Sequence, residues 1–223
     1  MFDRIAPRYD LVNRLLSAGT DVRWRRAAVD LLELPPGARV LDLCTGTADL
    51  LVEALAREGG SRGIGLDLSL EMLRRGAGKL ARRGLAERGG LAQGDAERLP
   101  VRDTCCDGAL VAFGVRNLAD PRAALREMRR ALRPGGRLVV LEFAMPRGML
   151  GALSRAYFRG VLPRVGGLLS GDRAAYAYLP ASVGLFPTPE AFAALLKQAG
   201  FADIRFRPLT GGIAYLYRGE RAR

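Results

Sequence analysis

The sequence of 223 residues contains no histidine and only three cysteines, and both shortages exclude kinds of chemistry. Serine–histidine and cysteine–histidine nucleophilic pairs are excluded, and so are the usual histidine-rich zinc sites. Cys44, Cys105 and Cys106 are too few and too unevenly spaced for a disulfide framework or a zinc knuckle. We therefore expect a reduced, cytoplasmic protein that holds no metal.

Long apolar runs and lysine are also scarce. No apolar run approaches the ~18 residues that cross a bilayer, and the first ten residues carry charges where a signal peptide would be apolar. Lys79 and Lys197 are the only lysines, so arginine supplies the other 33 basic residues of a chain with net charge +12. This charge leaves two interpretations open: a nucleic-acid or membrane-surface partner, or the arginine-rich composition of a GC-rich genome.

What the sequence contains is an alternation of short apolar runs with amphipathic stretches, which predicts an α/β fold with crossover helices. With 49% apolar residues at this length, one domain is expected. Seven strands are predicted, at residues 39–45, 63–68, 91–95, 107–114, 137–143, 204–206 and 213–217. The helices between them are predicted at 49–58, 70–80, 121–132 and 189–199. The last two strands predict an antiparallel hairpin at the edge of a doubly wound, mostly parallel sheet.

Helix starts are marked by capping residues. Ser69 is a predicted N-cap, and Asp120 followed by Pro121 is typical of a helix start. Leu118 and Leu125 share one face of that helix by their spacing.

Two segments interrupt the alternation: residues 1–36, which are helical with aromatic tips, and residues 145–187, which separate the fifth strand from the last helix. Both attach beyond the carboxyl ends of the strands, where open α/β sheets bind ligands. We therefore predict N-terminal helices and a helical insert as lids over a cofactor-binding core at 38–144. Residues 188–223 add the last helix and the hairpin.

The sequence LDLCTGTAD at 41–49 carries the strongest functional signal. A strand, a tight turn of small residues and a helix bring backbone against a ligand, and Asp67 ends the next strand, where it can accept both ribose hydroxyls. An NAD-binding GxGxxG fingerprint is not met, because the register from Gly46 supplies one of its three glycines. The acidic Asp42 followed by a single central glycine instead favours S-adenosylmethionine. An ordinary strand–turn–helix is the alternative.

Further positions fall where the adenine of such a cofactor would lie. Asp95 can accept the exocyclic amine, the Ala96 amide can donate to a ring nitrogen, and Met72 can pack on the ring. Phe113 ends the fourth strand at the same edge of the sheet. The structural alternatives are a turn residue at Asp95 and a core residue at Met72.

The motifs FGVRN at 113–117, YAYLP at 176–180 and LTGGI at 209–213, together with the opening FDRIAPRYDLVNRLLSAGTDVRWRR, carry a resemblance over residues 2–219. The chain resembles the C-methyltransferases of menaquinone and ubiquinone biosynthesis. The resemblance implies the Rossmann-like class I methyltransferase fold. It also implies transfer of a methyl group from S-adenosylmethionine to a ring carbon of a polyprenylated quinol precursor. The conversion of demethylmenaquinol to menaquinol is the first interpretation. A benzoquinol precursor of ubiquinone, or another phenolic or quinoid molecule, is the alternative.

Carried over residue by residue, the resemblance places cofactor contacts on Thr47, Asp67, Asp95 and Ala96. The full predicted cofactor set is Asp42, Thr45, Gly46, Thr47, Asp67, Met72, Asp95, Ala96 and Phe113. The chain departs from the family at Ala48, where glycine is usual, at Ala112, where some relatives have serine, and at Tyr217, where histidine is common. A diverged paralogue therefore stays open.

Carbon methylation needs an electron-rich acceptor, because the sulfonium donor is already activated. A hydroquinol hydroxyl has a pKa near that of tyrosine, ~10, and without histidine its proton must go to a carboxylate, a tyrosine or a held water. We hypothesise that Arg116 stabilises the developing phenolate and that Asn117 helps to orient the ring or the water. Glu142 is the alternative base, and an ion pair of Arg116 with Asp120 is the structural alternative. Residues predicted to close the substrate pocket are Tyr9, Asp10 and Tyr178.

The insert offers one explanation of the charge. Residues 145–187 hold five arginines against one aspartate, beside an apolar stripe at helical spacing. A basic amphipathic helix can lie at an anionic membrane or accept a polyprenyl chain, and a core-packing lid helix is the alternative. We expect a peripheral position at the inner face of the cell membrane and no nucleic acid, because no basic face is interleaved with aromatics. A homodimer is left open.

Overall fold

A computed structural model describes residues 9–146 and 181–223, together with the single residues 6, 151 and 160. Most of the predicted lid at 145–187, with Tyr178 and the apolar stripe, therefore lies outside the described residues.

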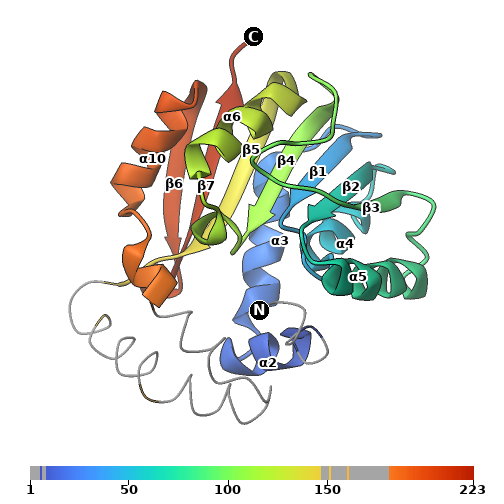
Figure 1. The fold of residues 1–223 in the computed structure, drawn as a ribbon, viewed down its shortest axis with the longest axis horizontal. Helices are drawn as coiled ribbons and strands as arrows, with labels where there is room; N and C mark the ends of the chain where they lie inside the picture. Colours follow the sequence, from blue (N-terminus) through green and yellow to red (C-terminus); the bar gives the residue numbers. More distant parts are fainter. Residues whose placement is uncertain (1–5, 7–8, 147–150, 152–159, 161–180) are drawn as a thin grey trace.

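In the described part of the chain, seven strands form one sheet in the order β3-β2-β1-β4-β5-β7-β6 (Figure 1). The strands are β1 Arg39–Leu43, β2 Arg62–Asp67, β3 Gly89–Gln93, β4 Cys106–Ala112, β5 Leu132–Phe143, β6 Phe201–Leu209 and β7 Ala214–Arg221. Strands β1 to β5 pair in parallel, and β7 runs antiparallel to both β5 and β6. The predicted sheet and its antiparallel hairpin edge are confirmed; β6 lies at the edge and β7 just inside it.

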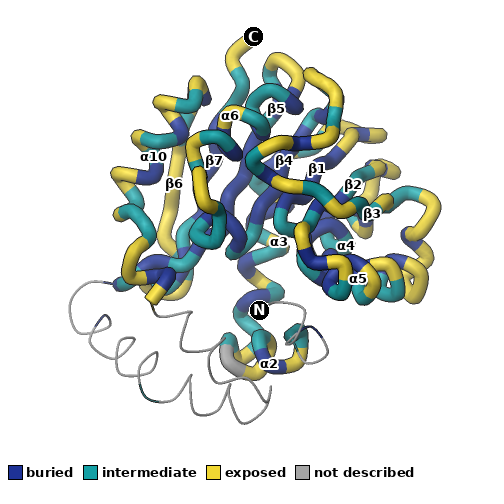
Figure 2. The backbone as a smooth tube through the Cα atoms, viewed as in Figure 1, coloured by how far each residue is buried: buried dark blue, intermediate teal, exposed yellow. Residues whose placement is uncertain are grey.

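Helices cover both faces of the sheet. They are α2 Tyr9–Leu16, α3 Thr20–Leu32, α4 Asp49–Leu55, α5 Leu70–Arg82, α6 Pro121–Ala131 and α10 Pro189–Gln198. Apolar side chains of α6 and α10 pack on one face and those of α3 and α4 on the other. Figure 2 shows the central strands buried between these layers, as expected for a parallel sheet covered on both faces.

The capping predictions are confirmed, while several element ends shift. The Ser69 hydroxyl accepts the Met72 N–H at 3.2 Å, and the Asp120 carboxylate accepts two N–H groups of the first turn of α6. Leu118 precedes the cap, outside α6, and packs against the core cluster that contains Leu125. Helix α4 ends at Leu55, three residues before the predicted end, because the chain turns through Gly59 and Gly60 to enter β2.

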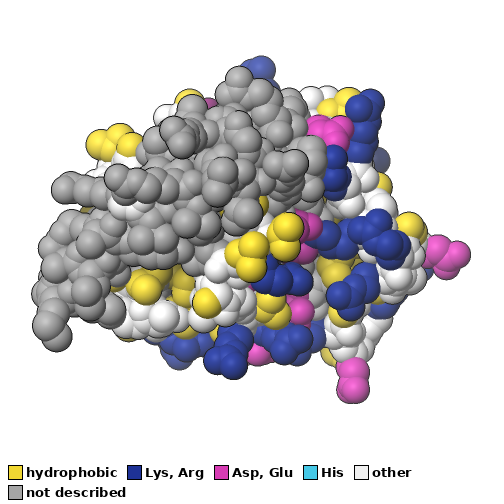
Figure 3. Space-filling view, turned by 90° about the horizontal axis from the view of Figure 1, so that it is seen from below, with side chains coloured by type: hydrophobic (Ala, Val, Ile, Leu, Met, Phe, Trp, Pro, Cys, Tyr) yellow, Lys and Arg dark blue, Asp and Glu magenta, His cyan; other side chains and the backbone are white. Residues whose placement is uncertain are grey.

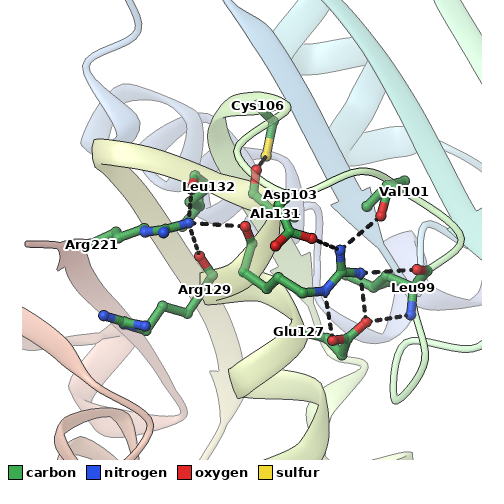
Figure 4. A network of polar contacts seen from close by, with 10 residues as sticks. Leu99, Val101, Asp103, Cys106, Glu127, Arg129, Ala131, Leu132 and Arg221 are labelled. Atoms are coloured by element: carbon green, nitrogen blue, oxygen red, sulfur yellow. Dashed lines mark hydrogen bonds and ion pairs between the residues drawn. The ribbon is translucent and has the colours of Figure 1, made fainter.

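The carboxyl end of α6 is held by an arginine from the last strand. Arg221 Nη1 donates to the carbonyls of Arg129, Arg130 and Leu132 at 3.1, 2.9 and 2.5 Å (Figure 4). These carbonyls include groups that have no partner within the helix, and a cation there also favours the helix dipole. Helix α6 is thus fixed at the end opposite to the loop that carries Arg116.

Two glycines of α5 lie in contrasting surroundings and allow a matched test of how tightly this helix packs on the loop after β1. A Cβ on Gly76 would lie 2.9 Å from a Leu91 methyl group and 3.1 Å from the Ala48 Cβ, whereas on Gly78 its nearest contact is the flexible end of Arg82 at 3.3 Å. We expect Gly76→Ala to lower the free energy of unfolding by about 1–3 kcal/mol through overpacking. Gly78→Ala should raise it by about 0.5–1 kcal/mol through helix propensity. Urea unfolding measures both, and a stabilised Gly76→Ala protein would contradict this packing.

Candidate active site

The loop between β1 and α4 alternates between ordinary and left-handed backbone conformations. Cys44, Gly46 and Ala48 have φ angles of 50, 54 and 63°. Glycine adopts this backbone conformation without strain, which is a physical reason for the glycine that is usual at position 48 in the proteins that the sequence resembles. Two of the three carry a Cβ in this chain, at a cost of about 1–2 kcal/mol each. Ala48 is fully buried in the cluster of α4 and α5 and lies outside the pocket lining.

Hydrogen bonds fix this loop against the ends of β1 and β2. The Gly46 N–H donates to Asp67 Oδ2 at 2.8 Å, and the Ser69 N–H donates to Asp67 Oδ1 at 2.9 Å. The Thr45 hydroxyl donates to Asp42 Oδ2 at 2.6 Å. The structure therefore brings Asp42 and Asp67 of the predicted cofactor set together with the glycine turn.

The end of β4 approaches the same loop closely. A Cβ on Gly114 would lie 2.4 Å from the Cys44 Cβ, so no larger residue fits there. This contact joins the FGVRN segment to the loop of the first motif. A pocket opens beside the junction, between α2, α3 and the two strand ends, and its lining includes Tyr9, Arg25, Asp42, Thr45, Thr47 and Phe113.

The sequence analysis does not identify two cations of this region: Arg25, which lines the pocket, and Lys79, which pairs with the lining residue Asp49. Arg25 of α3 is paired with Asp21 and lies 3.4 Å from Asp49 Oδ2. Lys79 of α5 pairs with Asp49 and with Asp10, the latter at 2.7 Å. The sequence offers one signal for Lys79: it is one of only two lysines in an arginine-rich chain.

Asp10 links the N-terminal helix α2 to this network. Its Oδ1 accepts the Thr47 hydroxyl at 2.5 Å, while its Oδ2 binds Lys79. The Thr47 hydroxyl also accepts from Lys79 Nζ at 3.0 Å. Tyr9, one residue earlier, lines the pocket itself, and burial raises the pKa of its phenol, against the opposing effect of Arg116.

Asp42 is a fully buried carboxyl of the site with a raised pKa. Burial raises its pKa to about 7, although hydrogen bonds from Thr45 and the Leu51 N–H act in the opposite direction. Its Oδ1 has no hydrogen-bond partner among the described residues. A buried carboxyl with one free oxygen in a pocket wall suits a cationic or N–H-bearing ligand.

Arg116 and Glu142 form a buried ion pair at the ends of two neighbouring strands. Arg116 lies in the 3-10 helix η2, Val115–Asn117, which follows β4, and its Nη1 is 2.5 Å from Glu142 Oε1. The Glu142 carboxylate, fully buried, also accepts the N–H groups of Arg116 and Phe143 at 3.3 and 2.9 Å. The alternative pair with Asp120 does not form, since Asp120 caps α6.

Arg116 also lies in the wall of a second pocket, of about 200 Å³. The rest of that wall is almost entirely apolar, and includes Pro121, Leu185, Phe186, Phe192 and Leu195. The Nε of Arg116 and the Oδ1 of Asn117 are buried without a hydrogen-bond partner among the described residues. Arg116 thus lines the apolar pocket and contacts the polar one through its hydrogen bond to the Phe113 carbonyl, and it is paired with Glu142.

The remaining predicted residues are placed as follows. Asp95 lies two residues beyond β3, is exposed, and accepts the Glu97 N–H at 2.8 Å in a turn. Ala96 and Met72 are buried. Among residues that the structure describes, acidic and cysteine side chains nowhere gather as a metal site, and none of the helices is long and apolar enough to span a bilayer.

Comparison with known proteins identifies the family. Residues 1–221 match the profile of the ubiE/COQ5 methyltransferase family. The chain belongs to this family. It is 50% identical to the "Ubiquinone/menaquinone biosynthesis C-methyltransferase UbiE" of Syntrophotalea carbinolica, over 100% of this chain and 93% of that one. It is also 50% identical to the "Demethylmenaquinone methyltransferase" of Thermus thermophilus, over 99% and 100%.

Solved structures share the fold at low sequence identity. A SAM-dependent methyltransferase of Thermotoga maritima superposes with a TM-score of 0.67 at 21% identity, covering 99% of this chain and 97% of that one. One from Aquifex aeolicus has a TM-score of 0.62 at 16% identity, covering 89% of each chain. The predicted class I methyltransferase fold is therefore confirmed.

The family assignment makes the chain an S-adenosylmethionine-dependent C-methyltransferase, with S-adenosylmethionine as its cofactor. The described site fits that cofactor on its own chemistry. A Cβ on Gly46 would meet open space, and the pocket wall holds Arg25 together with Asp42, whose Oδ1 has no hydrogen-bond partner among the described residues. Acidic and basic side chains in one wall match a zwitterionic amino-acid group.

The raised pKa of Asp42 predicts how stability depends on pH. The folded carboxyl keeps its proton up to about pH 7, whereas the unfolded one loses it near its ordinary value of 3.8. Between these values the folded state binds more protons, so the free energy of unfolding falls as pH rises, by up to about 1.4 kcal/mol per pH unit. Asp42→Asn removes this dependence.

The measurement is urea unfolding of the ligand-free protein from pH 5 to pH 8. Stability of the original protein relative to Asp42→Asn should decrease from pH 5 to 7 and then level off. A difference between the two that stays constant with pH would show that the carboxyl is already ionised at pH 5.

Proposed function

We propose that the protein methylates a ring carbon of a polyprenylated quinol, with demethylmenaquinol as the substrate. The names of two 50% identical relatives support the quinone pathway, and one of them names demethylmenaquinone. The single structural observation that carries the proposal is the position of Arg116 at the boundary between the cofactor pocket and an apolar pocket. A molecule with a polar ring and a hydrocarbon tail matches that boundary.

The loop and the strand ends would hold the cofactor. Asp67 at the end of β2 would accept the ribose hydroxyls, and Asp95, Ala96 and Met72 would contact the adenine. Asp42 and Arg25 would pair with the two charges of the methionine group, and Thr45 and Thr47 would shape the loop around it. Bound S-adenosylmethionine supplies a methyl group that is already activated by its positive sulfur.

Arg116 stabilises negative charge on the acceptor oxygen. Its side chain is 8% exposed, and its guanidinium is oriented by the Glu142 carboxylate and by the Phe113 carbonyl, 2.6 Å from Nη1. A cation preorganised in this way lowers the energy of a developing phenolate without moving during the reaction. The geometry favours an orienting role for Glu142 over that of a base, because its carboxylate already accepts three N–H groups.

Asn117 and Tyr9 complete the polar side of the acceptor site. The free Oδ1 of Asn117 can accept from a quinol hydroxyl or from a water that takes its proton. Tyr9, with its raised pKa, stays a neutral donor at pH 7. The pairing of Asp10 with Lys79 holds α2 over the cofactor loop as a cover.

The direct test of this function is product identification. The protein is incubated with methyl-labelled S-adenosylmethionine and, in separate arms, demethylmenaquinol and the benzoquinol precursor of ubiquinone. We expect label on a ring carbon of the naphthoquinol. Label on the benzoquinol alone would assign the alternative substrate, and label on neither would overturn quinol methylation.

The same assay tests Arg116 through a double variant that leaves no buried charge unpaired. Arg116→Met with Glu142→Gln should lower turnover about 100-fold, with little change in affinity for S-adenosylmethionine. The control is Arg126→Met, an exposed arginine of α6, which should keep full turnover.

We also propose that the carboxyl edge of the sheet contacts an anionic membrane surface. The support is a set of leucines at this edge that are 46–88% exposed: Leu11, Leu15, Leu68, Leu70 and Leu185. Figure 3 shows hydrophobic side chains beside Lys and Arg side chains on this side of the molecule. Exposed apolar groups next to cations suit an interface that supplies hydrocarbon and negative headgroups.

Sedimentation with vesicles tests the membrane contact. Vesicles containing phosphatidylglycerol should bind the protein more strongly than pure phosphatidylcholine vesicles, and Leu11→Ser with Leu15→Ser should weaken binding. Phe206→Ser, which changes an exposed aromatic residue on β6, should leave binding unchanged. Equal binding of the protein to both kinds of vesicle would contradict the proposed contact with an anionic membrane.

A further inference from the structure

The LTGGI turn between β6 and β7 contains a strained residue. Thr210 has a φ angle of 46°, within the left-handed region that β-branched residues avoid. Its neighbours Gly211 and Gly212, at 66 and 93°, adopt positive φ without that strain. A strained conformation persists where surrounding contacts determine it, and such positions gather near functional sites.

The contact at Thr210 is a hydrogen bond from the one tryptophan of the chain. Trp24 of α3 donates its indole N–H to the Thr210 hydroxyl at 2.9 Å, and the indole is 6% exposed. A buried indole N–H usually has a partner, and losing that partner is costly. The turn thus fixes the position of Trp24 from outside both pockets.

Trp24 packs on two aromatic rings that belong to the active site. Its ring centroid is 6.2 Å from that of Phe113 and 6.2 Å from that of Phe143, with interplanar angles of 56 and 82°. Phe113 and Phe143 stack on each other at 4.3 Å. Phe113 follows β4 and Phe143 is the last residue of the neighbouring β5, so Trp24 completes an aromatic trio across two strand ends.

Phe143 supports the Arg116 guanidinium. The Arg116 Cζ lies 5.3 Å from the centroid of the Phe143 ring, a cation–π distance. The Phe143 N–H also donates to the Glu142 carboxylate that pairs with Arg116. Phe113 lines the cofactor pocket, stacks on Phe143, and accepts a hydrogen bond from Arg116 Nη1 through its carbonyl at 2.6 Å. The acidic groups of that pocket, Asp42 and Asp67, are held by hydrogen bonds from Thr45 and Gly46. A shift of Trp24 should therefore reach Arg116 more than those acidic groups.

We propose that Thr210 is a positioning residue for Arg116, acting through Trp24 and Phe143. The inference rests on the role of Arg116 in the proposed function. Without the acceptor at Thr210, the indole loses its fixed orientation, its edge-on contact with Phe143 changes, and the guanidinium is no longer held on that ring. The expected consequence is a slower methyl transfer with nearly unchanged cofactor affinity.

The test compares two substitutions at Thr210. Thr210→Val keeps the β-branched shape, and therefore the backbone strain, but removes the acceptor. Thr210→Ser keeps the acceptor. We expect Thr210→Val to lower kcat about tenfold with KM for S-adenosylmethionine changed less than about twofold, and Thr210→Ser to restore kcat to near its original value. Because Trp24 is the one tryptophan, its emission maximum should shift in the valine variant and return in the serine variant.

A second measurement needs no turnover and separates this inference from the proposed function. Arg116→Met with Glu142→Gln should shift the Trp24 emission of the ligand-free protein, and the shift should be smaller when Thr210→Val is also present. An unshifted emission would overturn the link, whichever quinol is methylated. Equal kcat for Thr210→Val and Thr210→Ser in an active protein would overturn the positioning role.

Discussion

The buried ion pair of Arg116 and Glu142 is the interaction on which the arrangement of the site depends. Taking two charges out of water is costly, and such a pair persists where further hydrogen bonds satisfy both groups. Here the carboxylate accepts three N–H groups and the guanidinium also binds the Phe113 carbonyl. The pair joins the ends of β4 and β5, so a cation is held rigidly at the carboxyl edge of the sheet. Arg116 lines the apolar pocket, and Phe113, whose carbonyl it binds, lines the polar one.

The cofactor side is built on backbone conformation more than on side chains. Three alternating left-handed residues turn the chain sharply between β1 and α4, and acidic groups at the ends of β1 and β2 hold the turn by accepting its N–H and hydroxyl groups. Close packing follows from this turn, since Gly76 and Gly114 have no room for a side chain beside it. Asp10 joins helix α2 to this turn, because its carboxylate binds both the Thr47 hydroxyl and Lys79.

The sequence was sufficient for the elements whose signals are local. Alternating apolar runs predicted the sheet, and Ser69 and Asp120 predicted helix starts, because a cap acts within three residues of its own position. Arg116 shows the limit: its local partner Asp120 was considered, but the structural partner is Glu142, 26 residues away on the adjacent strand. Arg25, Lys79 and the bond of Trp24 to Thr210, which spans 186 residues, depend in the same way on tertiary packing. The ends of helices and strands differ from the predicted ends because turns and strand pairing determine them, and the apolar periodicity contains no information on either.

One measurement tests the central claim most directly: a crystal structure of the protein with S-adenosylhomocysteine and a short-chain demethylated naphthoquinol. The account predicts that the ring lies against Arg116, with a hydroxyl within hydrogen-bond distance of the guanidinium and the isoprenoid tail in the pocket of Phe186 and Leu195. The unmethylated ring carbon should face the sulfur. A quinol bound with its hydroxyls away from Arg116, or outside that pocket, would contradict the account.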